Sequence, residues 1–376
     1  TTYYVYGKLD RKGLFPFGEL AQLQEQLGFT YHHERVIKVH AQERTVETAS
    51  GTEPYDRILV ATGATAFAPP VKGLEPEDSF LMRTVEDAQR LKDRLDRGDV
   101  KTAVVVGASM AGIKVVEVLA HYGAQVVLAA RAKTTFPLAA YREVAAMIEG
   151  RVAKRGVDLR FGVTIDHMET VDGQKTAFLT DGTAVPADLV SLCIGPRAAT
   201  AVVQGEVEIN RGIVVNDRME TSVPDIYAAG DCCEGNNLES GQHQIIGLWA
   251  NANRQGRTAG ANMAGCEAAF EGNILHNITH FMDMDFIGFG DNRIQGEVLE
   301  TGSPDHGLYI RVVLQEGKIV GANILDDYRI SGIVKNYMLR LFAGEQGKLP
   351  DYQKAMLLRS GVPEKFIDKL EGKLHG

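Results

Sequence analysis

Residues 102–133 read TAVVVGASMAGIKVVEVLAHYGAQVVLAARAK, and their pattern predicts the fold of the central part of the chain. Its opening apolar run ends at the glycine loop 107–112, and the apolar positions that follow predict a helix over 113–122. Gly123 ends this helix, and 125–129 is a second apolar run. A strand, a glycine loop, a helix and a second strand in this order predict a βαβ unit.

The glycine loop would bring backbone N–H groups and a helix N-terminus to one place, which suits a pyrophosphate. A tight strand-to-helix turn without a ligand is the alternative interpretation. Ser109 stands where such loops carry their middle glycine, and it is small enough to be tolerated. Arg131 and Lys133 follow the second strand, where an acid would hold a ribose 2′-hydroxyl. Two cations favour a 2′-phosphate, and so NADPH over NADH, unless both are simply solvated. The residues predicted to contact this nucleotide are Gly107, Ser109, Met110, Gly112, Arg131 and Lys133.

Two stretches of the chain end alike. Residues 56–63 and 188–195 each begin with an acid, continue as a short apolar run typical of a buried parallel strand, and end at a glycine, Gly63 or Gly195. The glycine loop precedes Gly195 by 195 − 107 = 88 residues, and the same offset from Gly63 falls before the first residue, at 63 − 88 = −25. We therefore expect two related folds, the first of which lacks its front in this chain.

The same kind of meander leads into both stretches. Asp172-Gly173 and Asp181-Gly182 are strong hairpin turn signals, and Ser50-Gly51 marks a similar turn in the first copy. The strands that these turns join are expected at 163–171, 175–180 and 183–185, and at 31–40 and 44–49 in the first copy. One dinucleotide-binding fold inserted within another explains this pattern better than a single large domain. The predicted fold class is α/β, with two nested Rossmann-like domains.

Composition excludes several classes of protein. The chain has 376 residues and a formal net charge of −9, without a long basic run, which disfavours nucleic acid and anionic membranes as partners. It has no apolar stretch near the roughly 20 residues that span a bilayer, and no signal-peptide pattern, so we expect a cytoplasmic protein. Four cysteines without a C-x-x-C pair argue against a disulfide framework and a zinc ribbon.

The motifs together resemble a known family. Residues 55–64, which read YDRILVATGA and are followed by Pro69-Pro70, and residues 221–231, which read TSVPDIYAAGD, resemble two signatures of the pyridine nucleotide-disulfide oxidoreductases. With the glycine loop between them, the resemblance covers roughly residues 30–270. Residues 252–257, ANRQGR, resemble the NADH oxidase, coenzyme A disulfide reductase and nitrite or rubredoxin reductase branches.

The resemblance implies a flavoprotein in which NAD(P)H, bound on the central domain, reduces FAD. Thr62 and Gly63 would lie near the adenine side of FAD, and Gly195 would lie at the nucleotide site of the inserted domain. Asp231, after Gly230, would bind ribityl or pyrophosphate oxygens at the N-terminus of a following helix, or else serve only as the N-cap of that helix. The family usually carries Glu where this chain has Lys114, which implies altered hydride geometry, a different partner or a lost activity.

The resemblance also divides the chain into domains. Residues 1–98 would form the first and incomplete segment of the FAD domain, 99–197 the NAD(P) domain, 198–272 the second FAD segment, and 273–376 an α+β interface domain that supports a homodimer. Within the last domain we expect a hairpin of 308–314 with 319–325 and helices over 330–343 and 363–370. Met282, Met284 and Phe286 are interpreted as core or interface residues rather than an electron-transfer patch.

Cysteines and histidines yield no catalytic prediction. Cys232 and Cys233 follow Asp231 and would lie near the flavin, but small buried thiols are the simpler interpretation. Cys193 and Cys266 are expected in the core, the latter on a helix. His276 and His280 are expected in a strand, and no third ligand suggests a metal site.

Two functions remain open. The first is an NAD(P)H-dependent flavoprotein oxidoreductase that passes hydride to FAD and electrons to a small-molecule or small redox-protein acceptor. The second is a flavin-free nucleotide-binding sensor or scaffold subunit descended from the same family.

Overall fold

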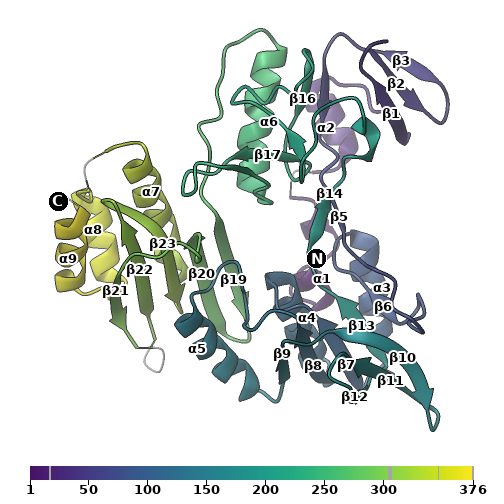
Figure 1. Ribbon diagram of the computed structural model, residues 1–376, viewed down its shortest axis with the longest axis vertical. Helices are drawn as coiled ribbons and strands as arrows, with labels where there is room; N and C mark the ends of the chain where they lie inside the picture. The colour runs from purple at the N-terminus through teal and green to yellow at the C-terminus, as the bar shows by residue number, and fades with distance from the viewer. Residues whose placement is uncertain (17, 304–306, 346, 375–376) are drawn as a thin grey trace.

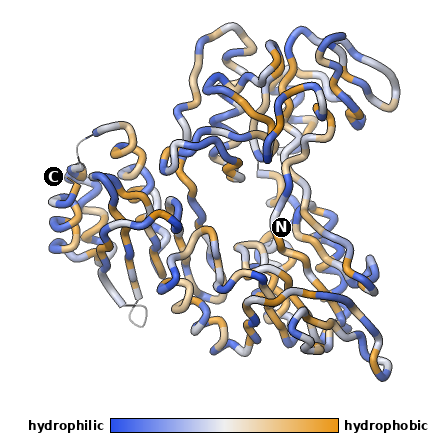
Figure 2. The backbone as a smooth tube through the Cα atoms, in the orientation of Figure 1, coloured by the Kyte–Doolittle hydropathy of each residue, from blue (hydrophilic) through white to orange (hydrophobic). Residues whose placement is uncertain are grey.

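The computed structural model describes residues 1–16, 18–303, 307–345 and 347–374, and it divides into three units (Figure 1). A central unit surrounds a parallel sheet, an outer unit lies above it, and a C-terminal unit lies at the side. The apolar residues concentrate in the strands and the helices that cover them, as the hydropathy colouring of Figure 2 shows. The fold is thus a mixed α/β architecture with a Rossmann-like parallel sheet and a C-terminal antiparallel sheet.

The central unit is built on a five-stranded parallel sheet in the order β6-β13-β7-β8-β9. Its strands are β6 (Ser79–Phe80), β7 (Thr102–Val106), β8 (Gln125–Ala130), β9 (Asp158–Phe161) and β13 (Leu189–Leu192), and its helices are α3 (Val85–Asp96), α4 (Met110–His121) and α5 (Arg142–Ala153). The predicted βαβ unit is therefore confirmed. The short helix α1 (Thr2–Val5) packs against α3 and α4 through the buried Val5.

A three-stranded meander precedes β13, as the two Asp-Gly turns predict. It consists of β10 (Ile165–Val171), β11 (Gln174–Leu179) and β12 (Ala184–Pro186), all antiparallel. Asp172 and Gly173 both have positive φ angles, +50° and +82°, which suits a two-residue hairpin turn. This confirms the turn chemistry that the sequence indicates.

The outer unit consists of two segments, one that precedes and one that follows most of the central unit in the sequence. Its first segment contains η1 (Lys12–Leu14), α2 (Leu20–Leu27), β1 (Val36–His40), β2 (Thr45–Thr48), β3 (Thr52–Pro54) and β4 (Ile58–Val60). Its second segment contains η2 (Ala201–Val203), β15 (Ile213–Val214), β16 (Ile226–Ala228), β17 (Cys233–Asn236), β18 (His243–Gln244) and α6 (Trp249–Met263). The two segments meet where β16 pairs in parallel with β4. The strand expected over 31–40 occupies only Val36–His40.

A narrow neck connects the outer and central units. It is the antiparallel pair of β5 (Ala64–Ala66) and β14 (Pro196–Ala198), which carries the chain out of the outer unit and back again (Figure 1). The insertion of one unit into the other, predicted from the repeated strand ends, therefore exists in the backbone.

The C-terminal unit is a five-stranded antiparallel sheet in the order β19-β20-β23-β22-β21. Its strands are β19 (His276–Phe281), β20 (Met284–Gly290), β21 (Glu297–Gly302), β22 (Tyr309–Gln315) and β23 (Lys318–Leu325), followed by η3 (Tyr328–Ile330), α7 (Ser331–Phe342), α8 (Asp351–Arg359) and α9 (Glu364–Leu374). The predicted hairpin and two of these helices are present, whereas the sequence analysis missed α8.

Both faces of this sheet are buried, and alternate residues serve different cores. In β20, Met284 and Phe286 belong to the core of the central unit, while Ile287 and Phe289 pack beneath α7–α9. Met284 and Phe286 are 2% and 0% exposed, so they are core residues, as interpreted from the sequence. The C-terminal unit is therefore packed against the central unit rather than tethered to it.

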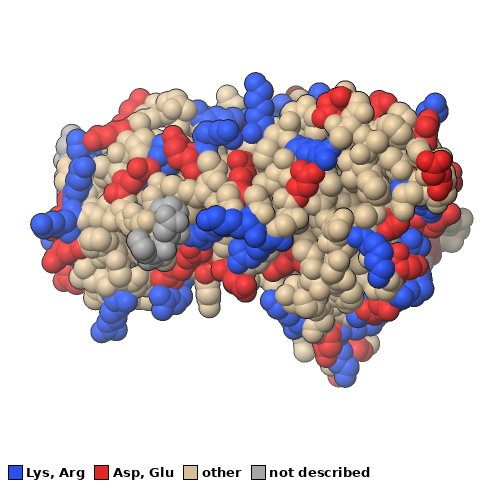
Figure 3. Space-filling model, turned by 90° about the horizontal axis from the view of Figure 1, so that it is seen from below, with Lys and Arg blue, Asp and Glu red and all other residues tan. Residues whose placement is uncertain are grey.

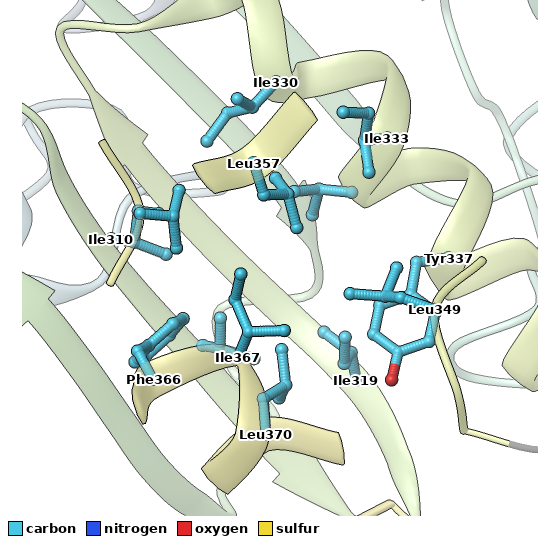
Figure 4. Close-up of a pocket in the computed structure, with 13 residues that line it drawn as sticks. Ile310, Ile319, Ile330, Ile333, Tyr337, Leu349, Leu357, Phe366, Ile367 and Leu370 are labelled. Atoms are coloured by element: carbon cyan, nitrogen blue, oxygen red, sulfur yellow. The ribbon is translucent and has the colours of Figure 1, made fainter. Parts of the chain in front are cut away.

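An apolar cavity of about 30 Å³ lies between this sheet and its helices (Figure 4). Only apolar side chains and the ring of Tyr337 line it, and the Tyr337 hydroxyl donates a hydrogen bond to the carbonyl of Gly347. A space of this size and lining holds no nucleotide, so it is a packing feature of the C-terminal core.

A buried carboxyl group connects the outer and C-terminal units. Glu239, in the β17–β18 loop, accepts a hydrogen bond from the Leu275 amide at 2.7 Å, and its Oε2 is buried without a hydrogen-bond partner among the described residues. Burial is the main cause that raises the pKa of Glu239 to about 8, and the negative charge of Asp291 adds to it. The folded protein therefore favours the neutral acid.

Replacing Glu239 by Gln is expected to change how stability depends on pH. Because the pKa is raised from 4.5 in the folded state, the wild-type free energy of unfolding falls as pH rises from 4.5 towards 8, whereas the amide stays neutral. When thermal unfolding is measured at a series of pH values, the melting temperature of the variant relative to that of the wild type should increase as pH rises. Glu267→Gln, at an exposed position, is the control. If the melting temperatures of the variant and the wild type differ by the same amount at pH 5 and pH 9, the raised pKa of Glu239 is contradicted.

Candidate functional sites

The glycine loop of the central unit adopts the conformation that its sequence requires. Gly107 has a φ of +111°, and a Cβ at this position would collide with the carbonyl group of Cys193 at the end of β13. A Cβ on Gly112 would collide with the carbonyl oxygen of Gly107. Both glycines are therefore fixed by close backbone approach, independently of any ligand.

Ser109 closes this loop with its side chain. As the N-cap of α4, its Oγ accepts a hydrogen bond from the Gly112 amide at 3.2 Å and donates one to the Cys193 carbonyl at 2.9 Å. The amides of residues 108–111 have no acceptor among the described residues. These free N–H groups at the N-terminus of a 12-residue helix fit a phosphate, with Met110 as the first helical residue.

Arg131 and Lys133 lie in the loop after β8, at the edge of the sheet where the glycine loop also lies. Both side chains are exposed, and neither forms an ion pair with a described acid. Gly195, at the end of β13, has a φ of +103° and leads into the neck. The structure thus brings these residues to the carboxyl ends of β7, β8 and β13, where nucleotides bind in open parallel sheets.

A second candidate site lies where β4 and β16 end. Gly63 and Gly230 both have positive φ angles, +67° and +84°, and Asp231 follows directly. Thr62 donates a hydrogen bond to the Ala199 carbonyl at 2.6 Å, which ties this turn to the strand that returns through the neck. Thr62, Gly63, Gly230 and Asp231 are therefore brought together, as expected from the parallel pairing of the two strands.

Asp231 does not cap a helix, so that interpretation was wrong. The residues after it form β17, and α6 begins only at Trp249, with Leu248 as its N-cap. The carboxylate nevertheless lies beside the segment that enters α6, since a Cβ on Gly247 would be 3.7 Å from it. A hairpin separates Asp231 from the helix, and no local pattern distinguishes this from a direct cap.

Arg83 is the residue of this site that sequence reasoning missed. Its Nη2 lies 3.1 Å from Asp231 Oδ2, and its Nε donates to the Ala64 carbonyl at 2.9 Å. It precedes the N-cap of α3, Thr84, and so reaches across from the central unit to the outer unit. Its partner is 148 residues away in the chain, so no local signal could have found it.

Three of the four cysteines are buried, and Cys266 is exposed. Cys232 and Cys233 are both 0% exposed, and their thiols donate to backbone carbonyls of Val60, Ala229 and Gly230. Burial raises the pKa of Cys193 to about 11. Cys266 is exposed and lies beyond the end of α6, so the expectation of a helical core position was wrong.

The two histidines of β19 have separate partners. His276 Nε2 lies 3.2 Å from Lys335 Nζ, and His280 Nδ1 lies 2.8 Å from Asp285 Oδ1. Within the described residues no group of three His, Cys, Asp or Glu side chains has the arrangement of a metal site.

Lys114 is a buried cation at the junction of the units. Its ammonium group pairs with Glu117 one turn along α4 and donates to the His280 carbonyl at 2.7 Å, and it lies 4.5 Å from the centre of the Tyr3 ring. Glu117 in turn accepts a hydrogen bond from the Met282 amide at 2.8 Å, at the turn between β19 and β20. Lys114 therefore joins α4 to the C-terminal unit.

Three comparisons relate the chain to known proteins. The family model of pyridine nucleotide-disulphide oxidoreductase matches residues 5–256, and the chain belongs to this family. It is 27% identical over 302 residues to the nitrite reductase [NAD(P)H] of Bacillus subtilis, covering 79% of this chain but only 36% of that protein. The chain thus spans about a third of the length of this relative.

Solved structures share the fold. An engineered water-forming NADPH oxidase bound to NADPH, derived from the Lactobacillus brevis NADH oxidase, has a TM-score of 0.85 at 21% identity and covers 98% of this chain and 90% of its own. The putidaredoxin reductase in a covalent complex with putidaredoxin has a TM-score of 0.82 at 20% identity, with 96% and 88% covered. No helix among the described residues is long and apolar enough to cross a membrane.

Removing the cation from the buried pair is expected to destabilise the fold. Lys114→Met leaves the Glu117 carboxylate buried without its partner, which typically costs about 3–5 kcal/mol. The double variant Lys114→Met/Glu117→Gln removes the buried negative charge but keeps an acceptor for the Met282 amide. Its free energy of unfolding should therefore exceed that of Lys114→Met by more than about 1 kcal/mol. Urea denaturation of both variants and of Glu117→Gln measures this coupling. If the loss of stability in the double variant equals the sum of the losses in the two single variants, Lys114 and Glu117 do not stabilise each other.

Proposed function

We propose that the protein is an NAD(P)H-dependent flavoprotein oxidoreductase that passes electrons to a small-molecule or small redox-protein acceptor. The observation that carries the proposal is the pairing of β4 with β16, which brings Gly63 and Asp231 to one edge, where Arg83 contacts Asp231, while the inserted unit presents its own glycine loop. Membership of the family supports this assignment of two sites to two nucleotides. The proposal includes a cytoplasmic location and a homodimer formed through the C-terminal unit.

The residues at the two sites fit the cofactors in different ways. The free amides of residues 108–111 would hold the pyrophosphate of the nicotinamide nucleotide. At the second site Asp231 would accept a hydrogen bond from a hydroxyl group, and Arg83 would balance a phosphate charge near it. FAD, when bound, supplies the two-electron acceptor for the hydride. This chain's side chains then bind and orient rather than react.

Cofactor binding is the direct test. The purified protein should bind FAD, and NAD(P)H should bleach the visible flavin absorbance without oxygen. Asp231→Ala removes a charged hydrogen-bond partner, worth about 1.5–3 kcal/mol, so FAD affinity should fall about 10- to 100-fold. Asp217→Ala, at an exposed position of the same unit, should bind FAD like the wild type. Binding of NADPH with no binding of FAD would favour the flavin-free sensor or scaffold instead.

We propose NADPH as the preferred hydride donor. The engineered NADPH oxidase carries a glycine-to-alanine and an aspartate-to-alanine substitution separated by as many residues as Gly112 and Ala130 here. Its next substitution introduces an arginine, and this chain has Arg131 directly after Ala130. Arg131 and the exposed Lys133 therefore supply positive charge where the 2′-phosphate of NADPH would lie.

Changing these cations should alter nucleotide preference rather than chemistry. Arg131→Ala is expected to raise the KM for NADPH about 10-fold or more, the worth of one charged hydrogen bond, and to leave the KM for NADH nearly unchanged. Ala130→Asp/Arg131→Ala should reverse the preference, because an acid there accepts the ribose 2′-hydroxyl. Lys154→Ala, an exposed change at the end of α5, is the control. Equal effects of Arg131→Ala on both nucleotides would contradict the assignment.

A further inference from the structure

Three basic side chains meet where the outer unit joins the C-terminal unit. Lys335 lies on α7 and His276 begins β19, and Lys335 Nζ is 3.2 Å from His276 Nε2. Burial lowers the pKa of Lys335, and the positive charge of Arg254, on α6 of the outer unit, lowers it further. We call Lys335, His276 and Arg254 the junction cluster.

The junction cluster has little negative charge to balance it. Among the described residues no acid forms an ion pair with Lys335, and its hydrogen-bond partner is a neutral ring. His276 Nδ1 lies 3.3 Å from the Ile274 carbonyl oxygen, so Nδ1 carries the hydrogen and Nε2 accepts one from Lys335. Arg254 lies 3.9 Å from Glu271, but that side chain is 86% exposed, so water screens the pair. On the face seen in Figure 3, by contrast, positive and negative side chains are interspersed.

This arrangement costs free energy unless an anion is bound. Lys335 and His276 are both half-buried. Burial is the main cause that lowers the pKa of His276 as well, and the charge of Lys335 lowers it further. Cations that are withdrawn from water are normally paired with an acid. In the junction cluster a second cation, Arg254, takes the place where an acid would be expected, so a bound anion would offset the repulsion.

One side of Lys335 is open to a ligand. Gly332 precedes Lys335 by three residues, so it lies on the same side of α7. Gly332 is exposed, and a Cβ at this position would meet nothing within 4 Å. The ammonium group has three N–H donors, and one of them is used by His276. The other donors are therefore available to a ligand that approaches from this side.

We propose that the junction cluster binds a phosphate group, either free or carried by a nucleotide. Guanidinium and ammonium groups both bind phosphate oxygens well. A phosphate dianion balances Lys335 and Arg254 together, whereas a carboxylate leaves one of the two cations unbalanced. With the anion bound, His276 takes up a proton from solvent and can donate a hydrogen bond from Nε2. The bound phosphate would join α6 of the outer unit to α7 and β19 of the C-terminal unit.

Calorimetric titration with inorganic phosphate tests the site directly. Excess FAD and NADP⁺ are present throughout, so that they occupy the two proposed nucleotide sites. We expect saturable binding of phosphate and much weaker binding of acetate at the same ionic strength. Lys335→Met should weaken phosphate binding about 10-fold or more, the effect of one charge-assisted hydrogen bond. Lys369→Met, the same change at an exposed position of α9, should leave it unchanged.

The outcomes of the titration separate the possible ligands. Equal phosphate binding by Lys335→Met and Lys369→Met overturns the proposal, as does binding of acetate as tight as that of phosphate. Adenosine monophosphate in place of phosphate distinguishes the two sources: tighter binding assigns the site to a nucleotide, and equal binding assigns it to the phosphate group alone. The titration is repeated without FAD and NADP⁺, so a failure of the protein to bind FAD contradicts the proposed function and not this site.

The imidazole of His276 provides a second measurement. Its proton resonance is assigned with His276→Gln and followed by NMR over a range of pH. Phosphate should raise the pKa of His276, because the anion stabilises the protonated ring. In buffer without phosphate, Arg254→Gln and Lys335→Met should melt at temperatures no lower than the wild type, since each removes a repulsion. If phosphate leaves the pKa of His276 unchanged in the folded wild type, the proposal is overturned.

Discussion

The parallel pairing of β4 with β16 holds together the two segments of the outer unit and fixes the path of the chain through the central unit. Ile58 pairs with Ile226 and Val60 with Ala228, so two strands that are 168 positions apart form one sheet. Parallel neighbours require a crossover connection, and here that connection is the whole central unit. The chain leaves through β5 and returns through β14, which explains why these two strands pair as a neck. Both strands also end at the same edge, which brings Gly63 and Gly230 together.

Features that repeat or alternate locally could be predicted from the sequence. The strand–loop–helix order at 102–133, the Asp-Gly turns and the buried strand ends all follow from periodicity and turn chemistry, and the structure contains each of them. The extent of β1 could not be predicted, because residues 31–35 are exposed and pair with no strand in the part of the chain that the structure describes. Helix α8 was missed because only two of its residues, Gln353 and Leu357, are buried, so its apolar periodicity is weak.

The candidate sites divide in the same way. The glycines of the central site could be predicted from the sequence, because close backbone contacts leave room only for glycine at Gly107 and Gly112. Arg83 could not be predicted from the sequence, because its role depends on its contact with Asp231, and only the fold brings the two residues together. The same holds for Lys114, whose substitution for the usual acid is visible in the sequence, whereas its partner Glu117 and its contact with the C-terminal unit are not. Long-range electrostatic partners are fixed by topology rather than by local pattern.

The two candidate sites differ in the charges that they would present to a phosphate. In the central unit the side chain of Ser109 occupies the Gly112 amide, so the amides of 108–111 and the dipole of α4 are what remain for an anion. At the second site the dominant fixed charge is the Asp231 carboxylate, which would repel a phosphate. Arg83 offsets that charge from the neighbouring unit, and it does so only when the neck holds the two units together. The pairing of β5 with β14 therefore does more than carry the chain between the two units, because it also keeps Arg83 beside Asp231.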